Sequence, residues 1–237
     1  MTLARRFDTQ RLLPPELEEL GPGELLVNEF FYSIQGESTH AGRPCFFIRL
    51  AGCHLRCSYC DTAYAFFEGR RVSVAECVEE ATRIGCNLVE VTGGEPLLQR
   101  ATPEILATLC DKGFEVLLET GGAIDPSHID RRVKKIVDLK TPSSGMSNQN
   151  VPDLAPKLGP GDELKFVIGD RADFDWARRW LGTRREDLSS EIPIHFSPVH
   201  DRLSPQELSK WVLEERLAVR VNLQLHKFIW PDVSRGV

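Results

Sequence analysis

Three cysteines stand close enough in the sequence to bind one inorganic group. Cys53, Cys57 and Cys60 are separated by three and then by two residues. For seven cysteines among 237 residues, chance would produce this spacing only about 0.006 times. A four-iron cluster normally takes four thiolates. Three thiolates would leave one iron open, as a catalytic zinc site leaves one position open for its substrate.

Two other interpretations of these cysteines remain open. Together with His54 they could hold a structural zinc ion, or they could be unrelated core residues, although the stretch around them is polar. The other four cysteines lie in or beside apolar stretches and are predicted to be small core residues; they are Cys45, Cys77, Cys86 and Cys110. No secretory hydrophobic segment follows the charged start of the chain. Free thiols and a cytoplasmic location are therefore expected.

Further candidate residues follow apolar runs that are long enough to be strands. Gly93-Gly94-Glu95-Pro96 comes directly after one such run, and two glycines let the backbone approach a ligand closely. Alone, this motif could be only a turn. Asp138 and Lys140 end a later strand on one face, and Ser197 ends another. Surface charges at the start of a loop are the alternative for the first two.

Arg49 is unusual because it lies in an otherwise apolar strand. A buried arginine needs an acidic partner, which could be a core carboxylate or a substrate carboxylate held in bidentate fashion. Gln35 and Glu37 follow another strand with one glycine between them. An amide and a carboxylate together suit the donor-rich edge of a 2-amino pyrimidinone, although exposed turn residues are the simpler interpretation. Thr92 could add a hydroxyl contact.

The overall composition is that of a globular domain. The sequence is 41% hydrophobic and 27% charged, and its net charge of -6 argues against a nucleic-acid groove. No apolar run is as long as a membrane span. Neither nucleic acid nor a membrane is therefore expected as a partner.

Strand and helix signals alternate along the chain. Ser73 with Glu76, and Ser204 with Glu207, predict helix starts with capping boxes. Thr102 is expected to cap a helix that ends before Gly113, and one more helix is expected over 172–181. The predicted strands cover residues 25–31, 45–50, 88–92, 115–118, 136–139, 164–168, 194–196 and 219–223.

This alternation predicts an α/β fold with a parallel sheet. A closed (β/α)8 barrel typically needs about 250 residues, so we expect an abbreviated, partial barrel. Residues 1–23 are expected to be an irregular lead-in, and 24–237 a single domain. The segment 141–161 is long for a loop and is expected to be a lid or a binding loop.

The run from Ala51 to Asp61 resembles the cluster loop of the radical S-adenosylmethionine (SAM) enzymes. Within that superfamily the chain most resembles the 7-carboxy-7-deazaguanine synthases, and the likeness extends from Asn28 to the C-terminus. The motifs that carry it are Ser33-Ile34-Gln35-Gly36-Glu37-Ser38, Phe47-Ile48-Arg49, Cys60-Asp61-Thr62, Val91-Thr92-Gly93-Gly94-Glu95-Pro96, Asp138-Leu139-Lys140 and His226-Lys227.

The resemblance implies a role for each matching residue. Cys53, Cys57 and Cys60 would hold a four-iron, four-sulfur cluster, and Thr62 a magnesium ion. SAM would be bound by Tyr59, Asp61, Gly94, Glu95, Asp138, Lys140 and Ser197. The substrate would contact Ile34, Gln35, Gly36, Glu37, Arg49, Thr92, His226 and Pro231.

The resemblance also implies a reaction, in which 6-carboxy-5,6,7,8-tetrahydropterin loses ammonia and becomes 7-carboxy-7-deazaguanine, a precursor of modified tRNA bases. An external one-electron donor such as flavodoxin or ferredoxin and a homodimer are expected. One alternative is another radical SAM enzyme, an activase of glycyl-radical enzymes, which would have no use for Arg49 and the Gln35/Glu37 pair. Another is a non-catalytic iron–sulfur or zinc protein.

Overall fold

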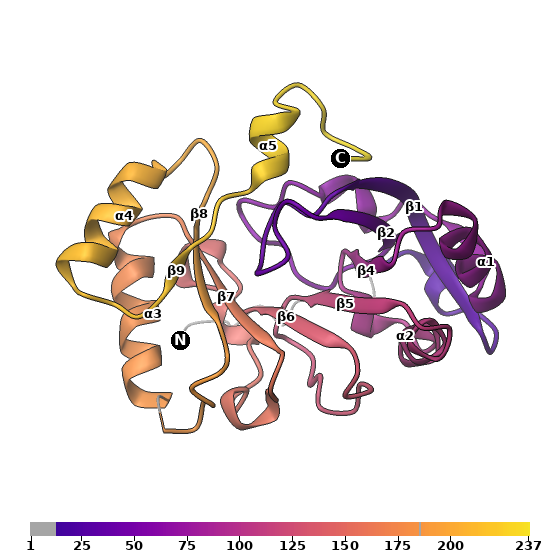
Figure 1. The fold of residues 1–237 in the computed structure, drawn as a ribbon, viewed down its shortest axis with the longest axis horizontal. Coiled ribbons are helices and arrows are strands. Elements are labelled where there is room, and N and C mark those ends of the chain that lie inside the picture. Colours follow the sequence, from indigo (N-terminus) through magenta and orange to yellow (C-terminus); the bar gives the residue numbers. More distant parts are fainter. Residues whose placement is uncertain (1–12, 185) are drawn as a thin grey trace, which may run out of the picture.

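A single curved sheet of nine strands forms the frame of the molecule (Figure 1). This computed structural model describes residues 13–184 and 186–237. The strand order is β3-β1-β2-β4-β5-β6-β7-β8-β9. β1 runs antiparallel to β2 and β3, and every neighbouring pair from β2 to β9 is parallel. The strands are β1 (Glu24–Ile34), β2 (Pro44–Leu50), β3 (Arg70–Ser73), β4 (Leu88–Gly93), β5 (Glu115–Thr120), β6 (Lys134–Asp138), β7 (Glu163–Ile168), β8 (Ile194–Pro198) and β9 (Arg220–Val221).

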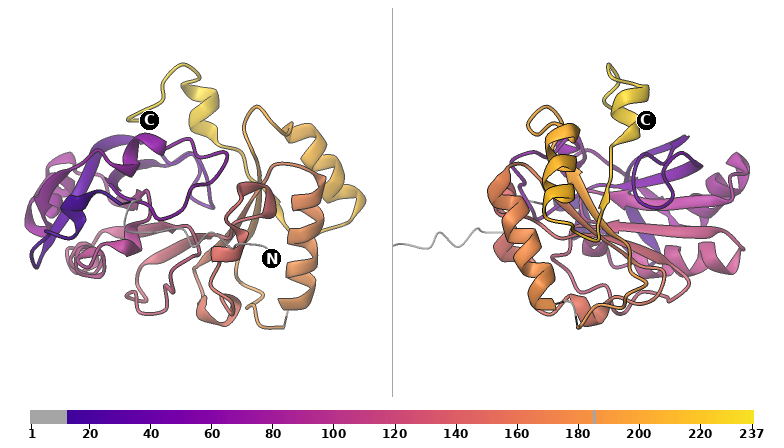
Figure 2. Two further views of the ribbon diagram at one scale, coloured as in Figure 1. Left: turned by 180° about the vertical axis from the view of Figure 1, so that it is seen from behind. Right: turned by 60° about the vertical axis from the view of Figure 1, so that its left-hand side comes forward.

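The sheet does not close on itself, because β3 and β9 are its two edges. Four helices lie outside it: α1 (Val74–Ile84) and α2 (Thr102–Asp111) beside the first strands, and α3 (Arg171–Arg184) and α4 (Pro205–Glu214) beside the last (Figures 1 and 2). The short helix α5 (Leu225–Ile229) lies across the opening between the two halves. The architecture confirms the predicted partial barrel.

The strands have an apolar outer face, and their inner face combines polar side chains with a smaller apolar cluster that includes Phe31 and Phe47. Ile48, Val91 and Leu118 belong to the core that packs against α1 and α2, while Phe166 and Phe196 belong to the core that packs against α3 and α4. The residues next to them in the strands point inward, because side chains alternate along a strand, and many of these are polar. These inward-pointing residues include Arg49, Glu90, Thr92, Glu119, Asp138 and Lys165.

The ends of the helices confirm some of the sequence predictions and correct one. Ser73 forms the complete capping box with Glu76. At Ser204 only half of the predicted box forms: Ser204 Oγ accepts from the Glu207 N–H at 3.1 Å, without the return bond from the Ser204 N–H to the Glu207 side chain. Thr102 is not the cap of α2. Ala101 occupies that position, and the Thr102 hydroxyl donates instead to the Pro96 carbonyl at 2.6 Å.

Two predictions about irregular segments have different outcomes. In the lead-in, residues 13–23 contain only a short 3-10 turn before β1, while residues 1–12 lie outside the described part. The segment 141–161 forms three 3-10 turns and buries Leu154 and Ala155 in the core. None of its residues lines the large cavity on the inner side of the sheet, and a role as a lid or a binding loop stays a prediction.

The four cysteines outside the cluster loop divide into two pairs. Cys45 and Cys77 are fully buried, as predicted, whereas Cys86 and Cys110 are half-buried at the margin of the core. No helix in the described residues is both long enough and apolar enough to span a membrane.

Candidate functional site

A cavity of about 700 Å³ lies on the inner side of the sheet. It gathers residues from both halves of the chain, and β2, β4, β5, β6 and β7 all contribute to its wall. Most of the residues expected from the sequence line it: Ile34, Gln35, Gly36, Glu37, Arg49, Cys53, Cys57, Tyr59, Cys60, Asp61, Thr62, Thr92, Gly94, Asp138, Lys140, His226 and Pro231.

The three-cysteine loop follows β2 and is held by backbone hydrogen bonds. Gly52 turns the chain with a φ of +90°, and the Ser58 N–H donates to the Ser144 carbonyl at 3.0 Å. Cys53, Cys57 and Cys60 all line the cavity. Burial raises the pKa of each thiol, that of Cys53 to about 12. A metal that binds here must therefore displace protons.

The arrangement of the thiols bears on the kind of metal group they could hold. Within residues 13–184 and 186–237, no three His, Cys, Asp or Glu side chains converge on a point where one ion could sit. In an iron–sulfur cluster the thiolates ligate the irons of an extended group and need not meet at one point. The donor set and its exposure to the cavity therefore fit such a cluster.

The glycine turn after β4 lies directly against this loop. A Cβ atom on Gly94 would be 2.3 Å from the Gly52 carbonyl oxygen and 2.9 Å from Cys53 Cβ. Glycine is therefore required at Gly94, and its backbone borders the cavity beside the thiols.

Two of the expected SAM-binding residues do not line the cavity. Glu95 is fully buried, and its carboxylate accepts from Gly121 N–H, Thr120 Oγ1 and Leu97 N–H at 2.8–3.0 Å. Burial raises its pKa despite these bonds. Ser197 is also buried and lies 3.3 Å from Asn222 Nδ2. Glu95 thus holds the glycine turn in place from behind.

Asp138 and Lys140 share one face at the end of β6, as their spacing predicts. Lys140 Nζ donates to Asp138 Oδ2 at 2.7 Å. Burial disfavours the ammonium, but Asp138 outweighs burial and keeps the pKa of Lys140 high. Asp138 Oδ1 is buried and has no hydrogen-bond partner among the described residues. This unused acceptor on the cavity wall suits a donor group of a bound ligand.

Arg49 has the core partner that the simpler interpretation requires. Its Nε donates to Glu29 Oε1 at 2.8 Å, and the Tyr64 hydroxyl donates to the same oxygen at 2.9 Å. The guanidinium carbon lies 5.2 Å from the Phe31 ring centroid. Since Arg49 also lines the cavity, Glu29 orients a cation that faces the open volume.

A charged cluster forms another part of the cavity wall. Lys165 Nζ donates to Glu37 Oε2 at 2.7 Å and also pairs with Glu119, while Gln224 Nε2 donates to Glu37 Oε1 at 2.6 Å. Burial opposes ionisation of Glu37, but Lys165 and Gln224 outweigh it and lower the pKa of that carboxyl. Glu37 is therefore a buried anion.

The pKa of Glu90 is shifted in the opposite direction to that of Glu37. Gln35 donates to Glu90 through Nε2, and the Gln35 Oε1 atom accepts from the Glu37 N–H at 2.5 Å. Burial, together with the nearby Glu119 carboxylate, raises the pKa of Glu90 well above its ordinary value. The cavity wall thus contains both a stabilised carboxylate and a carboxyl group that favours its neutral form.

The C-terminal segment closes the open side of the cavity. Leu225 N–H donates to the Gly36 carbonyl at 2.9 Å, and Lys227 pairs with Asp61 at 2.6 Å. Burial opposes ionisation of Asp61, yet Lys227 lowers its pKa to about 2. Burial also lowers the pKa of His226 and so favours the neutral imidazole.

Among the wall residues that the sequence interpretation missed are the polar side chains that bond to Gln35 or Glu37 or lie beside them, namely Glu90, Glu119, Lys165 and Gln224. The first three are charged residues within mainly apolar strands, which is the signal that singled out Arg49. Gln224 offered no such signal, because it lies between the last strand and α5.

Comparison with known proteins agrees with the site. The Radical SAM superfamily model matches residues 47–178. The 7-carboxy-7-deazaguanine synthase of Chlorobaculum tepidum is 44% identical over 90% of this chain and 97% of its own length. That of Koribacter versatilis is 41% identical over 89% and 99%. The crystal structure of QueE from Escherichia coli shares the fold, with a TM-score of 0.69 and 21% identity over 85% of this chain and 94% of that one. The chain therefore belongs to the 7-carboxy-7-deazaguanine synthase family of the radical SAM superfamily.

Proposed function

We propose that this chain converts 6-carboxy-5,6,7,8-tetrahydropterin (below, the pterin) to 7-carboxy-7-deazaguanine with loss of ammonia, in the biosynthesis of queuosine and other 7-deazapurines. One observation carries the proposal. A single cavity presents three thiols, a glycine turn, a cation oriented by Glu29 and a pair of amide and carboxylate side chains. Family membership implies a four-iron, four-sulfur cluster and SAM.

Cys53, Cys57 and Cys60 would hold the cluster at one side of the cavity. When bound, the cluster and SAM would supply radical chemistry for removal of a hydrogen atom at carbon 6 of the pterin. The protein residues around them position the two ligands and exclude water.

The wall residues beside the thiols would bind SAM. Gly94 offers backbone groups next to Cys53, Asp138 offers an unused buried acceptor, and Lys140 orients the Asp138 side chain by donating to its other oxygen. Tyr59 and Asp61 border the same volume. We assign Glu95 to the support of the glycine turn, and Ser197 is buried behind the wall and is the weakest member of the set.

The remaining wall residues would bind the pterin. Arg49 would grip the 6-carboxylate, for which a guanidinium is well shaped. Gln35 and Glu37 would face the 2-amino pyrimidinone edge, where Glu37 can accept from two donors. Ile34, Gly36, Thr92, His226 and Pro231 would complete this part of the site.

Magnesium, if bound, would be at Thr62. The Thr62 hydroxyl lies 2.9 Å from Asp61 Oδ1, and both residues border the cavity. Oxygen ligands suit Mg²⁺, which usually keeps several waters. The chemistry of these two side chains supports the assignment.

The working state of the protein is part of the proposal. We infer a cytoplasmic enzyme in which residues 24–237 act as one domain, since one sheet runs from β1 to β9. An external donor such as flavodoxin or ferredoxin would supply the electron near the half-buried Cys57 and Cys60. The exposed apolar side chains Phe228, Ile229 and Val233 around α5 are compatible with a homodimer.

The direct test is anaerobic reconstitution with iron and sulfide, followed by SAM, dithionite and the pterin. We expect about four irons per chain and a deazapurine product that is detectable by mass spectrometry. Cys57→Ala is the matched control and should cleave no SAM while keeping its fold. One zinc per chain, or a cluster-loaded enzyme that leaves the pterin unchanged, would contradict the proposal. The second outcome would revive the glycyl-radical activase, which the relatives do not favour.

A further inference from the structure

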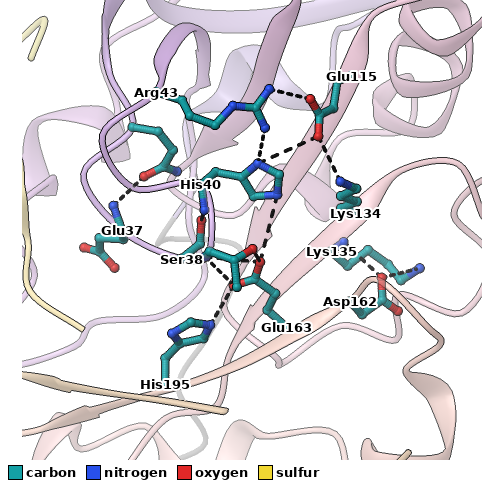
Figure 3. Close-up of polar contacts among 12 residues, drawn as sticks. Glu37, Ser38, His40, Arg43, Glu115, Lys134, Lys135, Asp162, Glu163 and His195 are labelled. Atoms are coloured by element: carbon teal, nitrogen blue, oxygen red, sulfur yellow. Dashed lines mark hydrogen bonds and ion pairs between the residues drawn. The ribbon is translucent and has the colours of Figure 1, made fainter. Parts of the chain in front are cut away.

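The loop between β1 and β2 reaches the start of β7, and Figure 3 shows its residues Ser38 and His40 beside Glu163. Its Thr39 N–H donates to Glu163 Oε2 at 3.0 Å, and the Thr39 hydroxyl bonds to the same carboxylate. Two residues earlier in the loop, Glu37 meets Lys165, which lies two residues later in β7. Because residues i and i+2 of a strand share a face, β7 grips the loop at two successive points.

Two histidines lie on the other side of Glu163. His195 Nε2 lies 2.7 Å from Glu163 Oε2, and His40 Nε2 lies 4.0 Å from Oε1 (Figure 3). Burial opposes the ionisation of Glu163, but His195 and Thr39 outweigh it and lower the pKa of this carboxyl. Glu163 is thus a fixed anionic acceptor that lines no part of the cavity.

The gripped loop contains a turn that needs support. Ser38 has a φ of +63°, in the left-handed region that is unfavourable for residues other than glycine. Such a conformation persists where the surroundings fix it. The Ser38 hydroxyl accepts from the His40 N–H at 3.1 Å on one side, and Glu163 holds Thr39 in between. The turn directly follows Gln35 and Glu37, which border the cavity.

We propose that Glu163 is a positioning residue, which fixes the turn at Ser38 through Thr39 and so places Gln35 and Glu37 for the pterin without touching it. This inference rests on the proposed function. It predicts that weakening the grip impairs binding of the pterin and leaves SAM binding intact, because the SAM-binding groups are on other elements.

The neighbouring Asp162 provides a matched control. It is as buried as Glu163, at 2% exposure each, and it forms a salt bridge with Lys135 Nζ at 3.1 Å. Its other bonds are to the backbone N–H groups of Lys135 and Gly159. Figure 3 shows that the Asp162–Lys135 pair is separate from the contacts of the loop. A change at Asp162 therefore tests the cost of disturbing a buried ion pair at the same end of β7.

The experiment compares Glu163→Gln, Thr39→Val and Asp162→Asn in the cluster-loaded enzyme. For Glu163→Gln we expect the KM for the pterin to rise about tenfold or more, a typical effect of removing a supporting residue, while the SAM affinity stays near that of the wild type. Hydrogen–deuterium exchange of the peptide 36–41 should also become faster. Thr39→Val should likewise raise the KM for the pterin and speed the exchange of the peptide 36–41. Asp162→Asn should lower the melting temperature but change neither the KM for the pterin nor the exchange rate of the peptide 36–41.

Three results would overturn the proposal. The first is that the loop of Glu163→Gln and Thr39→Val exchanges hydrogen as slowly as in the wild type. The second is that Asp162→Asn raises the KM for the pterin as much as Glu163→Gln does. The third is that Glu163→Gln loses SAM affinity in parallel with its rise in KM. If Glu163→Gln fails to fold, Thr39→Val decides, because Thr39 is an exposed residue. If the wild type does not turn over the pterin, the proposed function fails. The exchange comparison still decides whether Glu163 holds the loop.

Discussion

Single charged residues interrupt apolar strands at four places, Arg49, Glu90, Glu119 and Lys165, and each of them borders the cavity. A buried charge is costly without a partner. Arg49 has Glu29, and Lys165 has Glu37 and Glu119. Among the described residues, the side chain that bonds to the Glu90 carboxyl is the neutral amide of Gln35. These residues should therefore differ in their response to substitution and to pH.

Arg49→Lys tests the carboxylate clamp. The lysine keeps the positive charge but cannot form two parallel bonds to a carboxylate. We expect kcat/KM for the pterin to fall by about 10- to 100-fold, in line with the loss of one charged hydrogen bond, and uncoupled SAM cleavage to continue. A pterin that lacks the 6-carboxylate is the control ligand and should bind both enzymes equally. An equal loss of SAM cleavage would show that Arg49 has no special role toward the pterin.

Glu90→Gln tests the neutral carboxyl. The pKa of Glu90 is raised in the folded state, so its contribution to stability is fully present below the ordinary pKa near 4.5 and is lost as the pH rises through the folded value. Glutamine cannot ionise. The variant should therefore melt at a higher temperature than the wild type at pH 8, and the difference should narrow toward pH 5. A constant difference across this range would mean that Glu90 does not titrate there.

At the scale of elements, the capping box of α1 is the clearest case of a local sequence signal that forms as expected. Ser73→Ala removes the acceptor of the Glu76 N–H, which is 3.1 Å from Ser73 Oγ. The free energy of unfolding should fall by about 1 kcal/mol, measured by urea denaturation. Ser73→Asp retains an acceptor and should restore most of the loss. If both variants were equally unstable, the pairing of β3 with β1 would matter more than the cap.

The sequence predicts those elements whose signals are local and strong. Apolar runs identify the strands of the parallel sheet, and cysteine spacing identifies the cluster loop. β3 and α5 escaped prediction because the first is four residues long with two exposed arginines and the second has no buried residue. The prediction that Thr102 caps α2 is wrong because its hydroxyl donates to the Pro96 carbonyl in the preceding turn.

The part of the site that the sequence did not predict was missed for a different reason. Glu37 and Lys165 are ordinary residues in their own segments, and no local pattern says that they meet. Their contact depends on how far the loop between β1 and β2 reaches across the sheet, which only the assembled fold determines.

At the scale of the whole molecule, the opening of the barrel is closed where Gly36 meets the C-terminal segment. A Cβ atom on Gly36 would be 2.2 Å from His226 Nδ1 and 3.1 Å from the His226 backbone nitrogen. Gly36→Ala should displace α5, raise the KM for the pterin about tenfold and spare SAM binding.

The control for this variant is Gly182→Ala in α3, where an added Cβ meets nothing within 4 Å. That substitution should leave KM unchanged and raise stability by about 0.4–1 kcal/mol. Normal pterin kinetics in Gly36→Ala would show that contact between the two segments is dispensable for the site.

The reach of the β1–β2 loop also has a consequence for the order in which the chain is made. Glu37 meets Lys165 and Gln224, which follow it by 128 and 187 residues. The cluster loop therefore leaves the ribosome long before the opposite side of its cavity exists. Contacts between such distant segments form slowly, because long loops must close first. In pulse-labelled refolding, the Thr39 amide should become protected after those of α1. Loading of the cluster would then be a step that follows synthesis of nearly the whole chain.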